Sequence, residues 1–284
     1  MAWLIDGAKE GFCSYLTMNR QPEQPRHPKT RALAFLRLFR AVNLPTVPGD
    51  VFVGAAALLV GVAAAGGRTT AVAESLVPVW WAAAAGVFLY MFGLVDNDIA
   101  GAKTDEGRPI PDGEISLGAA RVARFLCLAA AAGAGVAGAL PCFWGFAAFA
   151  LALCCVVYNR TKWSALMGLC RGLNVLCGAL ALVVGNWRGV PGEGRLCLLA
   201  PAVAWTLYIW GVTKYSEGEG DDPAKKRRVG MLIGGIVYLQ LIALVVCAIL
   251  RPDVAPLRAL LVAGAVMLAL LRVMKTALPR VSAS

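Results

Sequence analysis

Charged residues are scarce in this sequence. Lys, Arg, Asp and Glu make up 15% of its 284 residues, whereas 59% of the residues are hydrophobic and the mean hydropathy is +0.68. Such a chain cannot cover a water-facing surface with polar side chains, which excludes an ordinary soluble domain. The composition therefore predicts a polytopic membrane protein.

Histidine is almost absent, since His27 is the only one. It lies in a proline-rich stretch, where we expect a solvated side chain in a flexible linker. A nucleophile activated by histidine would require His27 to fold back onto the site. The nine cysteines include no CxxC pair and are scattered through apolar stretches. We interpret them as small buried hydrophobic residues rather than as metal ligands or disulfides.

Two further patterns are missing. The apolar stretches show no alternation with period two, which argues against a transmembrane β-barrel. The first 30 residues hold no uninterrupted apolar run, because Asp6, Lys9 and Glu10 break it, and this argues against a cleavable signal peptide. We expect residues 1–32 to form an extension that could carry an interfacial helix and a Pro-rich linker, followed by a membrane domain at residues 33–284.

Long apolar runs dominate the rest of the chain. Each of eight runs is close to the length of about 20 residues that a helix needs to cross roughly 30 Å of hydrocarbon. Their Ala, Leu, Val and Gly content favours an all-α transmembrane bundle with close packing between small residues. The predicted spans are Val47–Ala65, Leu76–Val95, Leu117–Ala139, Cys142–Val157, Ala165–Asn186, Leu196–Val212, Val229–Leu250 and Pro256–Met274.

The basic residues divide unevenly between alternate loops. With the N-terminus inside, 21 of the 27 Lys and Arg residues fall in inside segments or near the inner ends of spans, 5 fall in outside loops or near the outer ends of spans, and Arg171 falls deep within a span. Because cytoplasmic loops retain Lys and Arg, this division predicts a multi-pass protein with both termini in the cytoplasm. The net charge of +10 then reflects topology and attraction to anionic lipids rather than nucleic-acid binding.

One loop after the second predicted span gathers carboxylates. Continuing that span as a helix puts Asp98, Gly101 and Asp105 on one face, with Asn97 adjacent. Two carboxylates and an amide oxygen are hard ligands that suit Mg²⁺, and Arg108 could hold a substrate phosphate. A solvated loop with turn residues explains the spacing equally well. The acidic residues of this loop are Asp96, Asp98, Asp105, Glu106, Asp112 and Glu114.

A second acidic cluster follows the sixth predicted span, on the same predicted side of the membrane. It has Glu217 and Asp221 at i, i+4, with Glu219 between them and Lys214 nearby. Two acidic clusters around the mouth of an apolar cavity suit a lipid diphosphate, because metal ions can bridge the diphosphate while the bundle holds the tail. The alternative is an ordinary charged loop, which fully explains the basic run Lys225–Arg228.

These motifs resemble those of the UbiA superfamily of intramembrane prenyltransferases. "NDIAGAKTDEGRPIPDGEIS" is similar to the first aspartate-rich signature, NDxxDxxxD, and "RLFRAVNLPTVPGDVFVG" to the Arg-x-x-Asn motif of the first helix. "VVYNRTKWSALMGLCRGLNVLCGA" and "GVTKYSEGE" resemble the EboC-type branch more specifically. The resemblance covers roughly residues 35–228 and implies a bundle of eight or nine helices, with a central cavity open toward the cytoplasm.

The resemblance also implies roles for individual residues. Arg171 and Asn174 would point into the cavity as catalytic residues, although an ion pair between Arg171 and Asp50 remains an alternative role. Tyr158 would act with them, or would simply anchor the helix at the membrane interface. The metal ligands would be Asn97, Asp98 and Asp105, with Glu217, Glu219 and Asp221 from the second cluster. The substrate-binding residues would be Asn43, Arg108, Lys162 and Lys214, of which Lys162 would also serve in catalysis.

The sequence departs from the pattern of this superfamily at several points. Gly101 stands where the signature has its middle aspartate, and the spacer from Asp105 to Arg108 is shorter than in the EboC-type branch. Gly218 and Gly220 weaken any helix that would carry the second cluster. The sequence also has eight predicted spans, whereas nine are typical of the superfamily.

We therefore expect Mg²⁺-dependent transfer of an isoprenyl group from a prenyl diphosphate to an unidentified lipophilic acceptor in the membrane, for which the resemblance suggests an aromatic ring. One alternative is a non-catalytic or transport-linked protein that binds a lipid or a prenylated metabolite. Another is a secondary transporter in which Arg171 and Asp50 handle an anion, although the inverted repeat typical of such folds is not evident. The sequence leaves the oligomeric state open.

Overall fold

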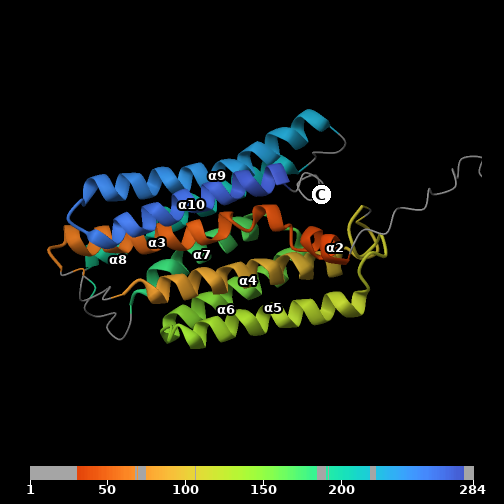
Figure 1. Cartoon of the computed structure of the whole chain (residues 1–284), viewed down its shortest axis with the longest axis horizontal. Coiled ribbons are helices and arrows are strands. Elements are labelled where there is room, and N and C mark those ends of the chain that lie inside the picture. The colour runs from red at the N-terminus through yellow and green to blue at the C-terminus, as the bar shows by residue number, and fades with distance from the viewer. Residues whose placement is uncertain are drawn as a thin grey trace, which may run out of the picture.

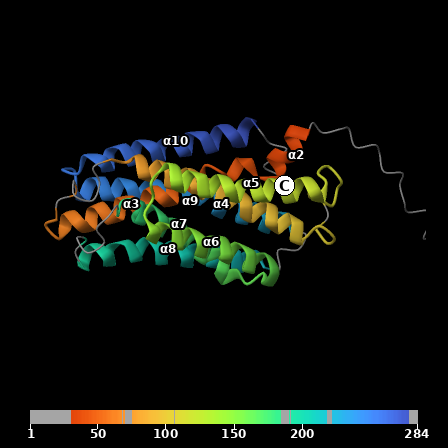
Figure 2. The ribbon, with the colours of Figure 1, turned by 90° about the horizontal axis from the view of Figure 1, so that it is seen from below.

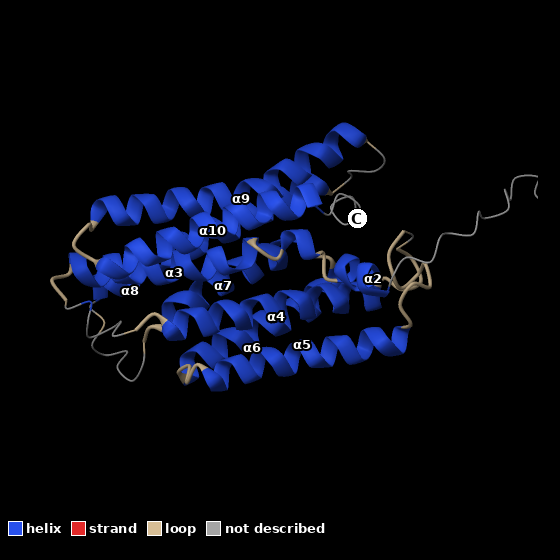
Figure 3. Ribbon diagram, viewed as in Figure 1, coloured by secondary structure: helices blue, strands red, loops and turns tan. Residues whose placement is uncertain are grey.

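The protein is an all-helical bundle in the part of the chain that the structure describes. The computed structural model describes residues 31–67, 69, 75–105, 107–183, 190, 192–217 and 222–277. These ranges hold nine α-helices and no strand (Figures 1 and 3). Eight helical segments are long and apolar enough to cross a membrane, which confirms the predicted fold class and number of spans.

The elements follow one another as α2 (Arg31–Leu38), the short 3-10 helix η1 (Ala41–Asn43), α3 (Thr46–Ala64), α4 (Val77–Ala100), α5 (Leu117–Ala137), α6 (Cys142–Thr161), α7 (Ser164–Ala181), α8 (Gly192–Ser216), α9 (Pro223–Leu250) and α10 (Ala255–Ala277). Helices α4, α6 and α8 each continue about one turn past the predicted end of their span. The apolar pattern stops earlier than the helix in α4 and α6, because their last turns carry polar residues that find partners in neighbouring elements. Most of the predicted extension at residues 1–32, with His27, lies outside the described residues.

Helices α3 and α7 cross at the centre of the bundle, where glycines allow their backbones to touch. A Cβ atom at Gly54 would lie 1.8 Å from the carbonyl oxygen of Val175, and one at Gly178 would lie 1.9 Å from that of Val51. Only glycine permits so close an approach. The other spans pack around this pair, with α4 and α5, and α9 and α10, as neighbouring helices (Figure 1).

The outer face of the bundle is apolar. Large side chains such as Phe125 of α5, Phe146 of α6 and Ile249 of α9 are mostly exposed. A contiguous apolar surface of this kind suits hydrocarbon rather than water. The interpretation that the cysteines are all buried is wrong for Cys142 and Cys197, which are exposed. A thiol on a helix that faces hydrocarbon needs no burial within the protein.

Three helices of the bundle, α4, α6 and α8, finish on the same side of it. This is the side where α2 also lies (Figures 1 and 2). Between the end of α4 and the end of α6, and again between the end of α6 and the end of α8, the chain crosses the bundle twice, so the three ends lie on the same side. The acidic loop after α4 and the described residues of the second cluster therefore share one end. That this end is cytoplasmic remains a prediction from the basic residues.

Candidate functional site

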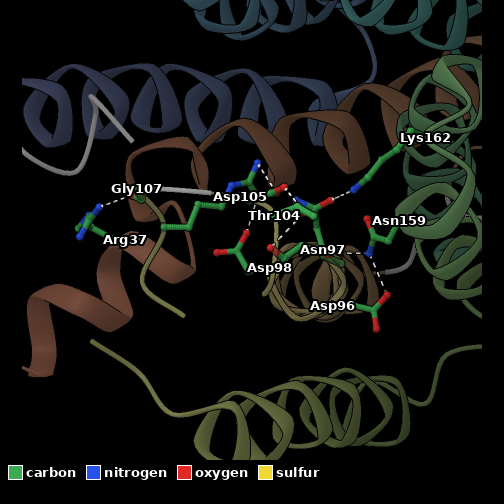
Figure 4. Close-up of polar contacts among 12 residues, drawn as sticks. Arg37, Asp96, Asn97, Asp98, Thr104, Asp105, Gly107, Asn159 and Lys162 are labelled. Atoms are coloured by element: carbon green, nitrogen blue, oxygen red, sulfur yellow. Dashed lines mark hydrogen bonds and ion pairs between the residues drawn. The ribbon is translucent and has the colours of Figure 1, made fainter. Parts of the chain in front are cut away.

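The last turn of α4 carries three polar side chains whose partners lie in α5, at the end of α6 and in the loop after α4. Asp96 and Asp98 are buried, each with 4% of its surface exposed. The Asp96 carboxylate accepts hydrogen bonds from Arg124 of α5 at 2.8 Å and from Asn159 of α6 at 2.9 Å. Figure 4 shows Asp98 on the opposite side of the helix from Asp96, and Asn97 turned toward Lys162 at the end of α6. The hydrogen bonds of Asp96 therefore link α4 to α5 and α6. Asn97 and Asp98 instead contact Lys162 and Arg108.

The prediction that α4 continues as a helix through Asp105 is wrong. The helix ends at Ala100, because Gly101 and the residues after it turn back on themselves. Asp105 nevertheless lies close to the helix end, since its carboxylate oxygen Oδ2 is only 2.4 Å from the place of a Cβ atom at Gly101. Its side chain thus occupies the space that any side chain at position 101 would need. The turn, rather than helical periodicity, brings Asp105 to the site.

The two carboxylates converge on the guanidinium group of Arg108. The Nη1 atom of Arg108 lies 2.6 Å from Asp98 Oδ1, and its Nη2 atom lies 3.3 Å from Asp105 Oδ2. The hydrogen bond to Asp98 is short and charge-assisted, and the longer contact to Asp105 is an ion pair, so one planar guanidinium group serves two carboxylates at once. The Asp98 and Asp105 carboxylates therefore lie on the same guanidinium group, one at each of its terminal nitrogens.

Lys162 reaches the same site from the connection between α6 and α7. It ends α6 in the left-handed conformation, with φ of 55°, and its Nζ atom donates to Asn97 Oδ1 at 2.5 Å. The ammonium group also lies 5.8 Å from the centre of the Tyr158 ring. Partial burial lowers the pKa of Lys162 below its ordinary value, and the carboxylate of Asp105 opposes this shift.

These side chains surround a cavity of about 300 Å³ between α4, α6 and α7. Arg40, Arg108, Lys162 and Arg171 contribute positive charge to its wall, whereas Asp105 contributes the negative charge. The remaining lining residues are Tyr90, Gly93, Leu94, Asn97, Cys155, Tyr158, Asn159, Met167 and Cys170. A small cavity with this excess of cations suits an anionic group attached to an apolar body.

Arg171 forms the ion pair with Asp50 that the sequence left as an alternative. Its Nε atom lies 3.0 Å from Asp50 Oδ2, and its Nη2 atom donates to the carbonyl of Thr46 at 3.0 Å. Asp50 is fully buried and also accepts from Asn174 at 3.2 Å and from Gln240 of α9 at 2.6 Å. Arg171 nevertheless lines the cavity, so it has both a structural contact and a place at the site.

The second acidic cluster is described only in part, because Glu219 and Asp221 lie outside the described residues. Glu217 lies 2.6 Å from Lys214 on the surface of the bundle. Hydrogen bonds from Lys214 and Ser164 lower the pKa of Glu217. That this cluster faces the first across one mouth stays a prediction. Asn43 is half-buried in η1, where its carbonyl oxygen accepts from the Thr46 hydroxyl at 2.7 Å.

The described residues contain no group of three or more His, Cys, Asp or Glu that could hold a metal ion. The oxygen atoms at the site still suit Mg²⁺, which typically takes one or two carboxylates and completes its shell with water and substrate phosphates. Asp98, Asp105 and Asn97 supply such a set. The chemistry of these donors therefore fits Mg²⁺ bound together with a phosphate ligand.

Sequence reasoning did not assign two residues that belong to the site. Arg40 lines the cavity from a left-handed backbone conformation, with φ of 42°, just before η1. It is the arginine of the Arg-x-x-Asn motif, so the motif contained the signal. Asn159 also lines the cavity and links α6 to Asp96. In the sequence, Asn159 follows Tyr158 at the polar end of an apolar run, and this position could have identified it as a site residue.

Neither a family model nor a curated protein matches the sequence. The fold is similar to a solved structure of digeranylgeranylglyceryl phosphate synthase, with a TM-score of 0.51 and 18% identity over 89% of this chain and 92% of that one. A UbiA homologue from Archaeoglobus fulgidus, solved with GPP and Mg²⁺, aligns with a TM-score of 0.47 and 16% identity over 87% of each chain. The chain is thus a polytopic membrane protein that shares the helical fold of the synthase.

Proposed function

We propose that the protein transfers an isoprenyl group from a prenyl diphosphate to a lipophilic acceptor within the membrane, with Mg²⁺ as its cofactor. The observation that carries this proposal is the cavity, where the Asp105 carboxylate and four cationic side chains meet at the polar end of an apolar bundle, with the buried carboxylate of Asp98 paired to Arg108 beside it. The shared fold of digeranylgeranylglyceryl phosphate synthase and the motifs of the UbiA superfamily support it. A lipid diphosphate matches both the charge and the apolar setting.

The polar residues at the mouth would bind the diphosphate. Arg40, Arg108 and Lys162 would contact its oxygens, and Asp98, Asp105 and Asn97 would hold Mg²⁺. A bound Mg²⁺ neutralises the charge that develops on the diphosphate as the bond to C1 of the prenyl group breaks. The cationic side chains would stabilise the same charge and keep water away from C1 by closing over the headgroup.

The deeper residues would face the prenyl carbon and the acceptor. Arg171 is held rigidly by Asp50, so it would present a fixed cation at the inner wall of the cavity. Tyr158 lies beside Lys162 on the same wall, and Asn174 supports the network behind Arg171. The resemblance to the superfamily suggests an aromatic ring as the acceptor. Glu217, Glu219 and Asp221 would add metal ligands, and Asn43 and Lys214 would contact the substrate.

One observation favours a different function. The guanidinium group of Arg108 already bridges the carboxylates that would hold the metal. A protein that binds a prenylated or lipid anion without catalysis would need only the cations, with the carboxylates as their partners. Ligand binding that does not require Mg²⁺ and releases no pyrophosphate would identify this second function.

Pyrophosphate release by the purified protein in lipid tests the proposal. Farnesyl and geranylgeranyl diphosphates are offered with and without Mg²⁺, together with a panel of lipophilic acceptors. Loss of an ion that stabilises the leaving charge typically costs about 100-fold or more in turnover, and we expect a loss of this size for Asp98→Asn and Asp105→Asn because each removes a proposed ligand of that ion. Asp253→Asn, an exposed carboxylate in the loop between α9 and α10, is the matched control. Unchanged turnover in both site variants would contradict the proposed metal site.

A further inference from the structure

Each of the three residues proposed above to hold Mg²⁺ has one oxygen in contact with a cationic side chain. Arg108 contacts Asp98 at 2.6 Å and Asp105 at 3.3 Å, and Lys162 contacts Asn97 at 2.5 Å (Figure 4). The site is thus neutralised by the protein itself. A divalent cation that arrives alone has to displace Arg108 or share the carboxylates with it.

The pairing of Arg108 with Asp98 follows from burial. The Asp98 side chain is 5% exposed, and a buried carboxylate without a partner is costly. Arg108 supplies the partner from a tight turn in which Gly107 adopts φ of 79°. Arg37 of α2 holds this turn in place by donating to the carbonyl of Gly107 at 2.8 Å. The guanidinium group is therefore built into the site.

Arg108 is also placed to leave the carboxylates. Its side chain is 31% exposed and lines the cavity, so rotation of the side chain alone can carry the guanidinium group toward an anion there. Its contact with Asp105 is the longer of the two, and the Asp105 side chain is itself 29% exposed. A diphosphate in the cavity would offer this group stronger, doubly charged acceptors.

We infer, on the basis of the proposed function, that Arg108 and the divalent cation compete for Asp98 and Asp105, and that a diphosphate ends the competition by drawing Arg108 onto itself. Metal and diphosphate then bind with positive coupling. Each partner binds weakly alone, because metal alone meets the guanidinium group and diphosphate alone must take that group from the carboxylates. The coupling is reciprocal, since both ligands act on one shared side chain.

The inference predicts effects of opposite sign for one substitution. Arg108→Gln removes the competing cation, so the protein should bind Mn²⁺ in the absence of any diphosphate about tenfold more tightly than wild type. The same change removes a contact to the anion, so farnesyl diphosphate in the presence of EDTA should bind about tenfold more weakly. A residue that only supported the fold would weaken both.

Both affinities are measured on the full chain in nanodiscs of neutral phosphatidylcholine, with the electron paramagnetic resonance of free Mn²⁺ and the equilibrium binding of labelled farnesyl diphosphate. Arg121→Gln, which changes an exposed arginine at the start of α5, is the matched control and should leave both affinities unchanged. Adding Asp98→Asn to Arg108→Gln should remove the gain in Mn²⁺ affinity. A gain that survives this second change would mean that Mn²⁺ binds elsewhere and would overturn the inference.

Mn²⁺ binding in Arg108→Gln that is equal to or weaker than in wild type would also overturn it. The proposed function would still stand if wild type released pyrophosphate in a manner that depends on Mg²⁺ and Asp98. If Arg108→Gln does not fold, Arg108→Lys takes its place. The compact ammonium group cannot bridge two carboxylates as a guanidinium group does, so it competes less with the metal ion. The Arg108→Lys variant should therefore bind Mn²⁺ more tightly than wild type. An unchanged affinity in Arg108→Lys would count against the inference.

Discussion

Gly101 affects the site through the side chain that it lacks. A Cβ atom at this position would lie 2.4 Å from Oδ2 and 2.5 Å from Cγ of Asp105, far inside van der Waals contact. The backbone of Gly101 has φ of −88° and ψ of 9°, which other residues adopt without strain. Glycine is thus required here for space rather than for backbone conformation. The absence of a carboxylate at position 101 is what allows the carboxylate of Asp105 to lie there.

Gly101→Ala should therefore displace Asp105 without unfolding the end of α4. We expect the Asp105 carboxylate to move away from Arg108 and the Mg²⁺ concentration for half-maximal pyrophosphate release to rise about tenfold, because one metal ligand is lost. A Mg²⁺ titration in lipid measures this. Gly118→Ala on α5, where a Cβ atom meets open space, is the control. An unchanged Mg²⁺ requirement would show that Asp105 is not a ligand.

At the scale of elements, α2 holds the loop that carries Asp105 and Arg108. The guanidinium group of Arg37 lies 2.7 Å from both carboxylate oxygens of Glu114 and 2.8 Å from the carbonyl of Gly107. Ala34 and Leu38 on the same helix pack with apolar residues of α4 and of the loop. One buried arginine therefore connects both halves of the loop to a helix that precedes the first span.

Arg37→Gln should loosen this loop while the bundle remains folded. Removing one partner of a charged hydrogen-bonded pair costs about 1.5–3 kcal/mol, and the cost falls on the loop because α2 lies outside the core of the spans. We expect faster amide hydrogen exchange in residues 101–116 and weaker binding of farnesyl diphosphate. Arg258→Gln, an exposed arginine at the start of α10, is the control. Exchange that stays as slow as in wild type would mean that α2 does not restrain the loop.

At the scale of the whole molecule, a buried polar network joins the central helices. Asp50 of α3 is fully buried and accepts from Arg171 and Asn174 of α7 and from Gln240 of α9. A buried ion pair contributes little net stability, but the loss of one partner leaves an uncompensated charge. The network therefore fixes how three helices sit together and holds Arg171 at the cavity.

Asp50→Asn should destabilise the bundle strongly, by about 3–5 kcal/mol, because Arg171 would stay charged and buried without its counter-ion. The double variant Asp50→Asn with Arg171→Met should recover much of this loss, since it also removes the charge. Thermal unfolding of the protein in detergent compares the two with wild type. If the double variant were no more stable than the single one, the cost would not come from the unpaired charge.

The sequence predicted the spans better than the site. Composition alone set their number, because hydrocarbon accepts only long apolar helices. It placed the ends of α4 and α6 one turn early, since polar residues there are satisfied by partners far along the chain. Asp98 and Asp105 were expected on one helical face, yet they meet through a turn that depends on the space left at Gly101. Local periodicity carries no information about such a turn.

The sequence by itself predicted the eight helical spans that the described part of the chain contains, and the polar residues that gather after the second span. Both follow from how local composition partitions between water and hydrocarbon. Only the tertiary structure decided which charges share the site. Arg40, Arg108, Lys162 and Arg171 line one cavity although they come from four separate segments. Their pairing depends on how α3 and α7 cross and how the loop folds back, and contacts between distant segments arise only when the helices pack.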